Sequence, residues 1–254
     1  MRVPEAFIVA VGDELVTGRR LDTNGTRLGR WLETLGCVVR ARSLVPDREE
    51  LIAEAVRVAL AAGTEVVVVT GGLGPTEADR TREGIAAALG SELVLDEATL
   101  ATIEDRYRER GKEIPDGARR QAFRPTGSEA VANPLGTAPG FIVDRGRALL
   151  VALPGVPREM DQMLQRSVLP VLRSRLAGAF VMRSALLHIA GLTEAEVDRR
   201  MSGRSGADTG VQITLLESHG EVEALVTVRA ETEDEADEEM GRAIAALESR
   251  LGDC

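Results

Sequence analysis

The sequence predicts an α/β domain in which a parallel sheet lies between two layers of helices, followed by a small α+β domain. Three observations support this. Apolar runs typical of buried strands alternate with helical patterns over residues 6–110, an order that favours a parallel sheet with helices on both faces. A glycine-rich turn follows one run and opens into a helix. After residue 180 the pattern changes. We therefore place the domains at residues 1–174 and 180–254.

The first domain is predicted to alternate strands with helices. Apolar runs predict four strands, at residues 6–11, 37–45, 65–69 and 93–95. The segments between them repeat apolar residues with the period of a helix. Asp22 or Thr23 would cap the first helix, and Gly36 would end it.

The helix after the second strand carries a start signal. Asp47, with Glu50 three residues later, resembles a capping box in which Asp47 is the N-cap. The apolar period predicts that this helix turns four side chains inward: Leu51, Ala55, Val58 and Ala62. Asp96 is expected to cap a later, charged helix that runs to Arg110.

The rest of the first domain is predicted to be less regular. Residues 141–144 and 148–153 read as a hairpin around a short turn that contains Gly146. Pro157 is suited to the first position of a helix that runs to about residue 176. Pro170 should kink that helix or end it early, because proline lacks the N–H that the helix needs.

The second domain has the predicted order strand, helix, strand, strand, helix. Its elements are residues 181–189, 193–201, 211–216, 222–230 and a final helix. The final helix is expected to bury one face: Ala236, Met240, Ala243, Leu247 and Leu251. His188 and His219 have no partner at metal-ligand spacing, so we interpret both as structural.

The composition argues against several functions. Aromatic residues make up 2% of the chain, too few for a single-stranded nucleic-acid platform. The formal charge of −10 disfavours duplex binding through a basic face. No apolar run is long enough to span a membrane, and no signal peptide is readable. Cys37 and Cys254 form no disulfide framework. We expect a cytoplasmic protein without nucleic-acid or membrane partners.

The glycine-rich turn is the strongest functional signal. Glycines let the backbone approach a ligand, and free N–H groups at a helix start attract anions such as phosphate. The candidates for substrate binding here are Thr70, Gly71, Gly72, Gly74, Pro75 and Thr76. Asp79 is an acid inside this anion-friendly loop, and a carboxylate beside a phosphate usually needs a cation between them. A divalent metal is therefore inferred.

Other candidates follow neighbouring strands, and parallel strands end at one edge of a sheet. Asp13, Glu14 and Asn24 follow the first strand and could hold a metal or a ribose, or could form a turn and a helix cap. Asp47 follows the second strand, where capping alone would explain it.

Two later loops are further candidates. Asn133, Gly136 and Thr137 lie in a segment rich in proline and glycine, which could contact a ligand or simply be a fixed loop. Gly155 and Glu159 lie at a strand end and a helix start. Glu159 could bind a ligand or only complement the helix dipole.

Together these motifs resemble the CinA family, whose N-terminal domain is similar to the MoaB and MogA molybdopterin-binding proteins. The matching segments are Gly12–Leu15 with Gly18, Asp22–Asn24, Thr70–Thr76 with Asp79 and Thr81, Gln121–Ala122, Asn133–Gly140, Leu153–Met160, and Gly191–Leu192 with Glu194.

The resemblance implies a MoaB/MogA-like three-layer domain, a small α+β domain and a homodimer. It also implies metal-dependent hydrolysis of ADP-ribose, a phosphate-containing nucleotide, to AMP and ribose 5-phosphate. Many members add a C-terminal domain that deamidates nicotinamide mononucleotide, an activity not expected of these residues. One departure stands out: Ala78 replaces the first of two family aspartates, although Glu77 could substitute for it.

The expected catalytic residues are Asp79, Asp47 and Glu14, and the expected ligands of Mg²⁺, Mn²⁺ or Co²⁺ are Asp13 and Asp79. Two alternatives to the hydrolase remain open. The chain could be a binding module for a molybdopterin-type phosphate without turnover, which the loss of an acid at Ala78 favours somewhat. It could also be a scaffold or a regulatory remnant of a longer enzyme.

Overall fold

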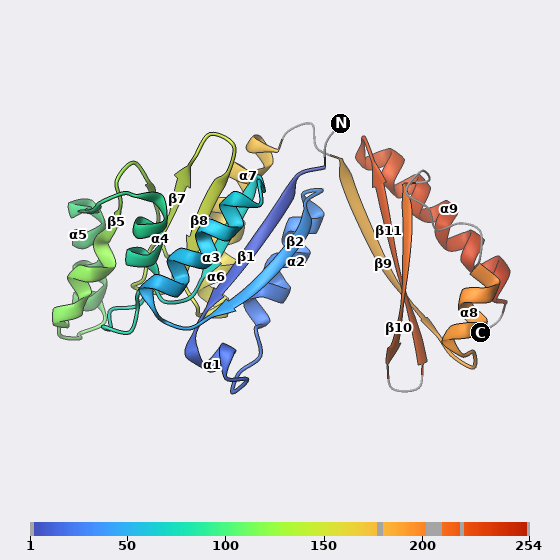
Figure 1. Ribbon diagram of the computed structural model, residues 1–254, viewed down its shortest axis with the longest axis horizontal. Coiled ribbons are helices and arrows are strands. Elements are labelled where there is room, and N and C mark those ends of the chain that lie inside the picture. The colour runs from blue at the N-terminus through green and yellow to red at the C-terminus, as the bar shows by residue number, and fades with distance from the viewer. Residues whose placement is uncertain (1–2, 177–179, 202–209, 219–220, 253–254) are drawn as a thin grey trace. The chain divides into compact units, whose positions relative to one another are not determined.

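The computed structural model describes residues 3–176, 180–201, 210–218 and 221–252. The chain forms two compact units. The larger unit holds nearly all of the elements from β1 to α7, and the smaller unit holds those from β9 to α9 (Figure 1). None of the described helices is long and apolar enough to cross a membrane.

A six-stranded sheet forms the centre of the larger unit. Four strands run parallel, in the order β2 (Val38–Val45), β1 (Glu5–Val11), β3 (Val66–Thr70) and β8 (Leu149–Leu153). Strand β7 (Gly140–Asp144) runs antiparallel to β8, and β6 (Glu129–Val131) runs antiparallel to β7 at the edge of the sheet. The sheet is therefore mixed, because the predicted hairpin supplies β7 and β8 as antiparallel neighbours.

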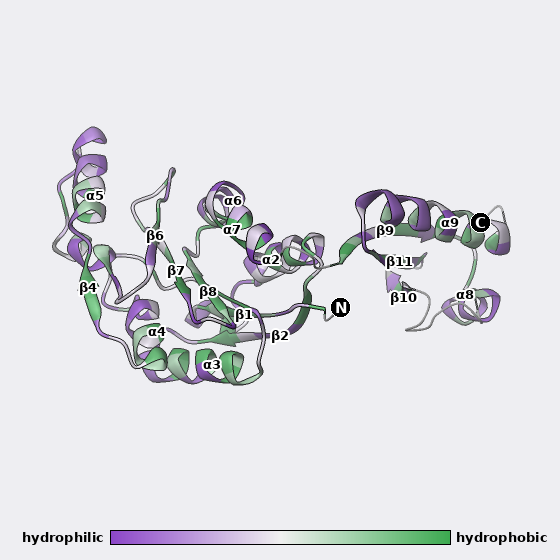
Figure 2. Cartoon of the chain, turned by 90° about the horizontal axis from the view of Figure 1, so that it is seen from above, coloured by the Kyte–Doolittle hydropathy of each residue, from purple (hydrophilic) through white to green (hydrophobic). Residues whose placement is uncertain are grey.

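Helices cover both faces of this sheet, so the predicted three-layer α/β architecture is confirmed (Figure 2). One layer contains α3 (Glu49–Ala61) and α4 (Thr81–Leu89). The other contains α2 (Thr23–Thr34), α6 (Pro157–Met163) and α7 (Leu169–Arg175). Aliphatic side chains fill the space between sheet and helices, as in the fully buried strand β3.

The segment after α4 forms an outer subdivision of the larger unit. Strands β4 (Leu93–Leu95) and β5 (Phe123–Pro125) pair with each other and stand apart from the six-stranded sheet. Helix α5 (Glu97–Glu109) and the 3₁₀ helix η1 (Asp116–Ala122) pack beside them. Asp96 caps α5 as predicted, because its carboxylate accepts from the backbone N–H of Thr99 at 3.0 Å. This contact lowers the pKa of Asp96, helped by Arg124.

The predicted inward face of α3 was wrong at Leu51 and Val58, which are exposed, whereas Ala55 is partly buried against the core. The side chains buried on this helix are Ile52, Ala53, Val56 and Ala59, whereas Val58 is 54% exposed. The helix is apolar on more than one side, so periodicity alone does not fix which side faces the sheet. Close packing fixes it, because Ile52 fits against Gly84 of α4, where a Cβ would lie only 2.7 Å from the Cβ of Ile52.

Pro170 does not end its helix. The chain continues from α6 through one π-helical turn (Leu164–Val168) into α7, which runs to Arg175. Proline removes one N–H donor and crowds the carbonyl four residues earlier. A π turn widens the helix at that point and relieves the crowding.

The smaller unit confirms the predicted order of elements. Strands β10 (Val211–Ser218), β11 (Glu221–Ala230) and β9 (Val181–Ile189) form an antiparallel sheet. Helices α8 (Glu194–Met201) and α9 (Glu233–Leu251) pack on it, and the predicted face of α9 is the buried one.

The structure describes one of the two cysteines and one of the two histidines. Cys37 is a free, buried thiol, and burial raises its pKa to about 12. His188 lies on β9 with its Nδ1 3.8 Å from Glu223. His219 and Cys254 lie outside the described residues.

The contact between α3 and α4 yields a prediction. Gly84→Ala should lower the free energy of unfolding by about 1–3 kcal/mol, because the new methyl group would overlap Ile52 and the carbonyl oxygen of Glu49. Gly29→Ala is the matched control on α2, where an added Cβ meets nothing within 4 Å. It should raise stability by about 0.5–1 kcal/mol, the usual gain for alanine in a helix. Urea denaturation of both variants checks this, and equal effects would contradict it.

Candidate functional site

The loops that follow β1, β2, β3 and β8 meet at the carboxyl edge of the sheet. The N–H of Gly12 donates to the carbonyl of Val45 at 2.9 Å, which joins the first loop to the second. The N–H of Gly71 donates to the carbonyl of Leu153 at 3.0 Å, which joins the third loop to the fourth. Candidate residues from four separate segments are therefore neighbours, as the parallel order predicts.

Asp13 and Asp47 form the acidic centre of this edge. The N–H of Asp13 donates to Oδ2 of Asp47 at 3.1 Å, and the N–H of Asp47 donates to Oδ1 of Asp13 at 3.3 Å. This reciprocal pair corrects the predicted capping box. The N-cap of α3 is Arg48 without a side-chain cap bond, and the carboxylate of Asp47 binds the first loop instead.

Asp47 lies among other negative charges. Burial is the largest cause that raises its pKa above the usual aspartate range, and the charges of Asp13, Glu14 and Asp79 raise it further. The hydrogen bond from Asp13 opposes this rise. Three of the predicted catalytic and metal residues thus act electrostatically on a fourth, although they come from different loops.

The glycine loop begins where backbone segments crowd together. Gly71 has a φ of 99°, and a Cβ there would lie 2.2 Å from the carbonyl oxygen of Val11. At Gly72, φ is 62°, and a Cβ would lie 2.3 Å from Thr81 Oγ1 and 3.3 Å from Asp47 Oδ1. Only glycine fits these two positions, which brings the loop backbone against the Asp47 carboxylate.

Asp79 folds back onto its own loop. Its Oδ1 accepts from the N–H of Gly74 at 2.8 Å, and its Oδ2 accepts from the N–H of Thr76 at 2.9 Å and from the Thr76 hydroxyl. The carboxylate therefore shapes the loop around Pro75. It also occupies two of the amides that the sequence assigned to phosphate binding.

Sequence reasoning missed Arg82, a buried side chain that binds the backbone of the glycine loop. Arg82 is 2% exposed and donates to the carbonyls of Leu73 and Gly74. Burial lowers its pKa to about 10, while Glu83 and Asp79 favour its charge. The sequence places Arg82 beside Glu83 in the first turn of a helix, a pattern typical of a solvent-exposed arginine. Only its burial in the structure identifies its contact with the loop.

Asn24 links the start of α2 to two strand ends. Its Nδ2 donates to Thr70 Oγ1 at 3.0 Å and to the carbonyl of Gly155 at 2.9 Å. Thr70 Oγ1 donates in turn to the carbonyl of Pro154 at 3.1 Å. These residues border a cavity of about 110 Å³ that Glu14 and Asp22 also line.

Asn133 and Glu159 organise a second group. Asn133 accepts from the N–H groups of Leu135 and Gly136, and its Nδ2 donates to Glu159 at 2.6 Å. A Cβ on Gly136 would lie 2.2 Å from the Glu159 carboxylate. Thr137 is half-buried in the same loop. Glu159 therefore binds the loop, beyond any interaction with the helix dipole.

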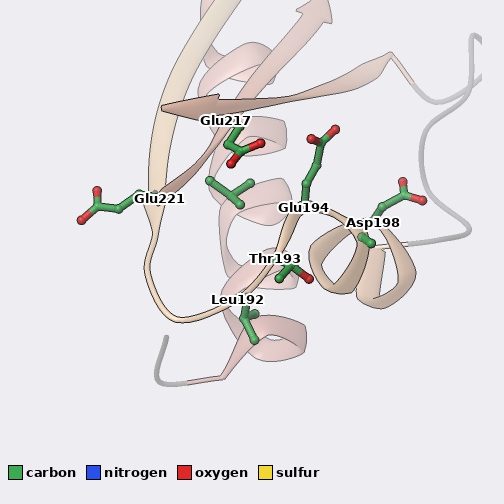
Figure 3. Close-up of a pocket in the computed structure, with 8 residues that line it drawn as sticks. Leu192, Thr193, Glu194, Asp198, Glu217 and Glu221 are labelled. Carbon is green, nitrogen blue, oxygen red and sulfur yellow. The ribbon is translucent and has the colours of Figure 1, made fainter. Parts of the chain in front are cut away.

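A second hollow lies in the smaller unit, near the start of α8 (Figure 3). It measures about 590 Å³, and four of its lining residues are acids: Glu194, Asp198, Glu217 and Glu221. Figure 3 shows Glu221 pointing away from the other three. The acids are thus spread over a surface. Among the described residues of the whole chain, no three His, Cys, Asp or Glu residues form a ready-made metal site.

Comparison with known proteins agrees with this architecture. The family described as "Probable molybdopterin binding domain" matches residues 7–174. A "CinA-like protein" of Geobacter sulfurreducens is 39% identical over 245 residues, which cover 96% of this chain and 59% of that protein. The chain thus spans well under two thirds of the length of that relative.

Two solved structures are similar to about two thirds of the chain. The protein CinA from Thermoplasma acidophilum is 36% identical, with a TM-score of 0.62, and the match covers 66% of this chain and 98% of that one. MoaB of Thermus thermophilus is 27% identical over 68% of this chain and 94% of its own, with a TM-score of 0.45. The chain therefore belongs to the CinA family, and residues 7–174 match the family described as a probable molybdopterin binding domain.

Proposed function

We propose that this protein is a metal-dependent hydrolase that cleaves the diphosphate of ADP-ribose, or of a related nucleotide, to AMP and ribose 5-phosphate. The observation that carries the proposal is the position of Asp47. Its carboxylate faces the backbone of Gly72, and Asp13, Glu14 and Asp79 act on its charge. A glycine turn that can approach phosphate thus adjoins a group of acids that requires a counter-charge.

The donor set fits a hard divalent cation. Mg²⁺ and similar ions use one or two carboxylates and complete their coordination with water and substrate phosphates. Asp13 and Asp79 would hold Mg²⁺, Mn²⁺ or Co²⁺, which would neutralise the diphosphate charge when bound.

The chain's own groups would supply the remaining chemistry. Glycine-loop amides other than those of Gly71, Gly74 and Thr76, which already have protein acceptors, would bind phosphate oxygens. Asn24, Thr70 and Thr137 would hold phosphate or ribose. Asp47 or Glu14 would accept a proton from the attacking water. The water oxygen would bond to one phosphorus, and the bond from that phosphorus to the bridging oxygen would break, which releases the two monophosphates.

The alternative proposal is a binding module for a molybdopterin-type phosphate without turnover. Its supporting observation is Asp79, whose carboxylate is already satisfied by donors of its own loop. In that role Asp79 would shape the loop and take no part in a reaction. For either function we propose a cytoplasmic homodimer that binds a small phosphate ligand and neither nucleic acid nor membrane.

Incubation with ADP-ribose separates the two proposals. The wild-type protein should release AMP with Mg²⁺, Mn²⁺ or Co²⁺ and none with EDTA, as measured by chromatography. Asp47→Asn should reduce the rate at least about 100-fold, the typical contribution of a general base. Asp144→Asn is the control, because this exposed residue ends β7. If no metal yields AMP, the hydrolase proposal fails and the binding module takes its place.

Restoring the family aspartate should increase activity. Ala78 is exposed next to Asp79, so Ala78→Asp adds a carboxylate without disturbing the core. We expect a rate at least severalfold higher, with a lower metal concentration needed for half-maximal activity, because a further ligand strengthens binding of a hard cation. Ala78→Asn is the uncharged control. A rate unchanged by the aspartate would show that Glu77 or no acid at all is needed there.

Thermal unfolding tests the counter-charge independently of turnover. The raised pKa means that folded Asp47 holds its proton more tightly than unfolded Asp47, so stability is lost as pH rises through the folded pKa. In EDTA at pH 7, Asp47→Asn should therefore have a higher Tm than wild type, by about 2–4 °C for each kcal/mol recovered. Mg²⁺ should raise the Tm of wild type by more than that of the variant, which keeps Asp13 and Asp79 but has one negative charge fewer to neutralise. A lower Tm for the variant in EDTA would contradict the claim that repulsion between Asp47 and the neighbouring acids destabilises the fold.

A further inference from the structure

The cavity between the first loop and the start of α2 has its own chemistry. Its volume of about 110 Å³ exceeds the roughly 30 Å³ that one water occupies. It is lined by residues from the loops after β1, β3 and β8. The polar groups on its wall include Glu14, Asp22, Asn24 and Thr70, and Arg20 supplies a cation.

The orientation of the Asn24 amide is fixed by its partners. The carbonyl of Gly155 can only accept, and Thr70 Oγ1 has already given its proton to the carbonyl of Pro154. Both therefore require the Nδ2 end of the amide. Oδ1 is left as a buried acceptor without a partner in the part of the chain that the structure describes, on a residue only 7% exposed.

Asp22 presents a second acceptor of the same kind. Its Oδ1 accepts from the N–H of Gly25 at 2.7 Å and so caps α2, as the sequence predicted. Its Oδ2 is buried and has no partner within the described residues. A buried acceptor without a donor destabilises the fold, so a ligand that supplies hydrogen-bond donors here would remove that cost.

We propose that this cavity is the sugar subsite of the ligand, in which Asp22 Oδ2 and Asn24 Oδ1 accept hydrogen bonds from vicinal hydroxyls of a ribose. The inference rests on the proposed function in that one ligand joins the sugar to a phosphate. Hydroxyls donate, whereas phosphate oxygens only accept and would be repelled by Asp22 and Glu14. The phosphate therefore belongs outside this cavity, on the glycine loop. Leu15, Leu21 and Pro157 line the wall with apolar groups that suit the C–H faces of a sugar.

The test is Asp22→Asn, which preserves the helix cap because asparagine caps as well as aspartate. It replaces the buried acceptor Oδ2 with a donor. Three probes without a diphosphate are titrated by calorimetry in Mg²⁺: ribose 5-phosphate, 2-deoxyribose 5-phosphate and inorganic phosphate. Wild type should bind the ribose compound more tightly than the deoxy compound, by about tenfold. In the variant this preference should disappear, while inorganic phosphate should bind equally well or more tightly because a negative charge has gone.

Each other outcome overturns the sugar subsite. If Asp22→Asn tightens all three probes by the same factor and keeps the preference for ribose, the cavity holds the phosphate. If wild type does not discriminate between the two sugars, or binds neither, the cavity holds ordered water only. Asp144→Asn removes one charge elsewhere in the larger unit, and circular dichroism verifies the fold of both variants. Failure of the hydrolase is a separate result: a protein that shows this sugar preference but yields no AMP keeps the subsite and loses the enzyme.

Discussion

The close approach of three backbone segments at Gly71 is the constraint on which the site depends. Gly71 bonds to the carbonyl of Leu153, lies against the carbonyl of Val11, and is within 3.3 Å of where a Cβ of Gly155 would stand. A side chain at residue 71 or residue 155 would push the strand ends apart. Because residues 71 and 155 are glycines, the loops after β1, β3 and β8 approach one another closely, and Asn24 bonds across this contact to Thr70 and Gly155.

Satisfied polar groups and unsatisfied ones divide the site into two kinds of surface. Asp79 accepts hydrogen bonds from its own loop, and Asn133 accepts from its own loop and donates to Glu159 of α6, so these groups hold the loops in place. Asn24 and Asp22 each keep one buried acceptor unused. Folded proteins rarely leave such atoms without a partner, so these two mark where the site gains most from a ligand.

The acids at the strand ends repel one another, which lowers the stability of the fold but suits the binding of a cation. Asp13, Glu14 and Asp79 raise the pKa of Asp47, which means that the fold tolerates repulsion at this edge. The core beneath can support this cost, because β3 is wholly buried and α3 packs tightly on Gly84 of α4. Repulsion between like charges is usual at sites that bind a ligand of opposite charge.

The sequence by itself determined the long strands and helices, the order of the two domains, the family and the set of loops that meet at the sheet edge, because strand runs, caps and glycine turns are local signals. The short elements at Asp13–Val16, Phe123–Pro125 and Glu129–Val131 were not predicted. Only the tertiary structure decided which face of α3 is buried, why Pro170 does not end its helix, and that Asp47 binds Asp13 where a helix cap was predicted. It also revealed the buried Arg82 and the free acceptors of Asp22 and Asn24. These features depend on packing and desolvation between segments far apart in the chain, which no local pattern encodes.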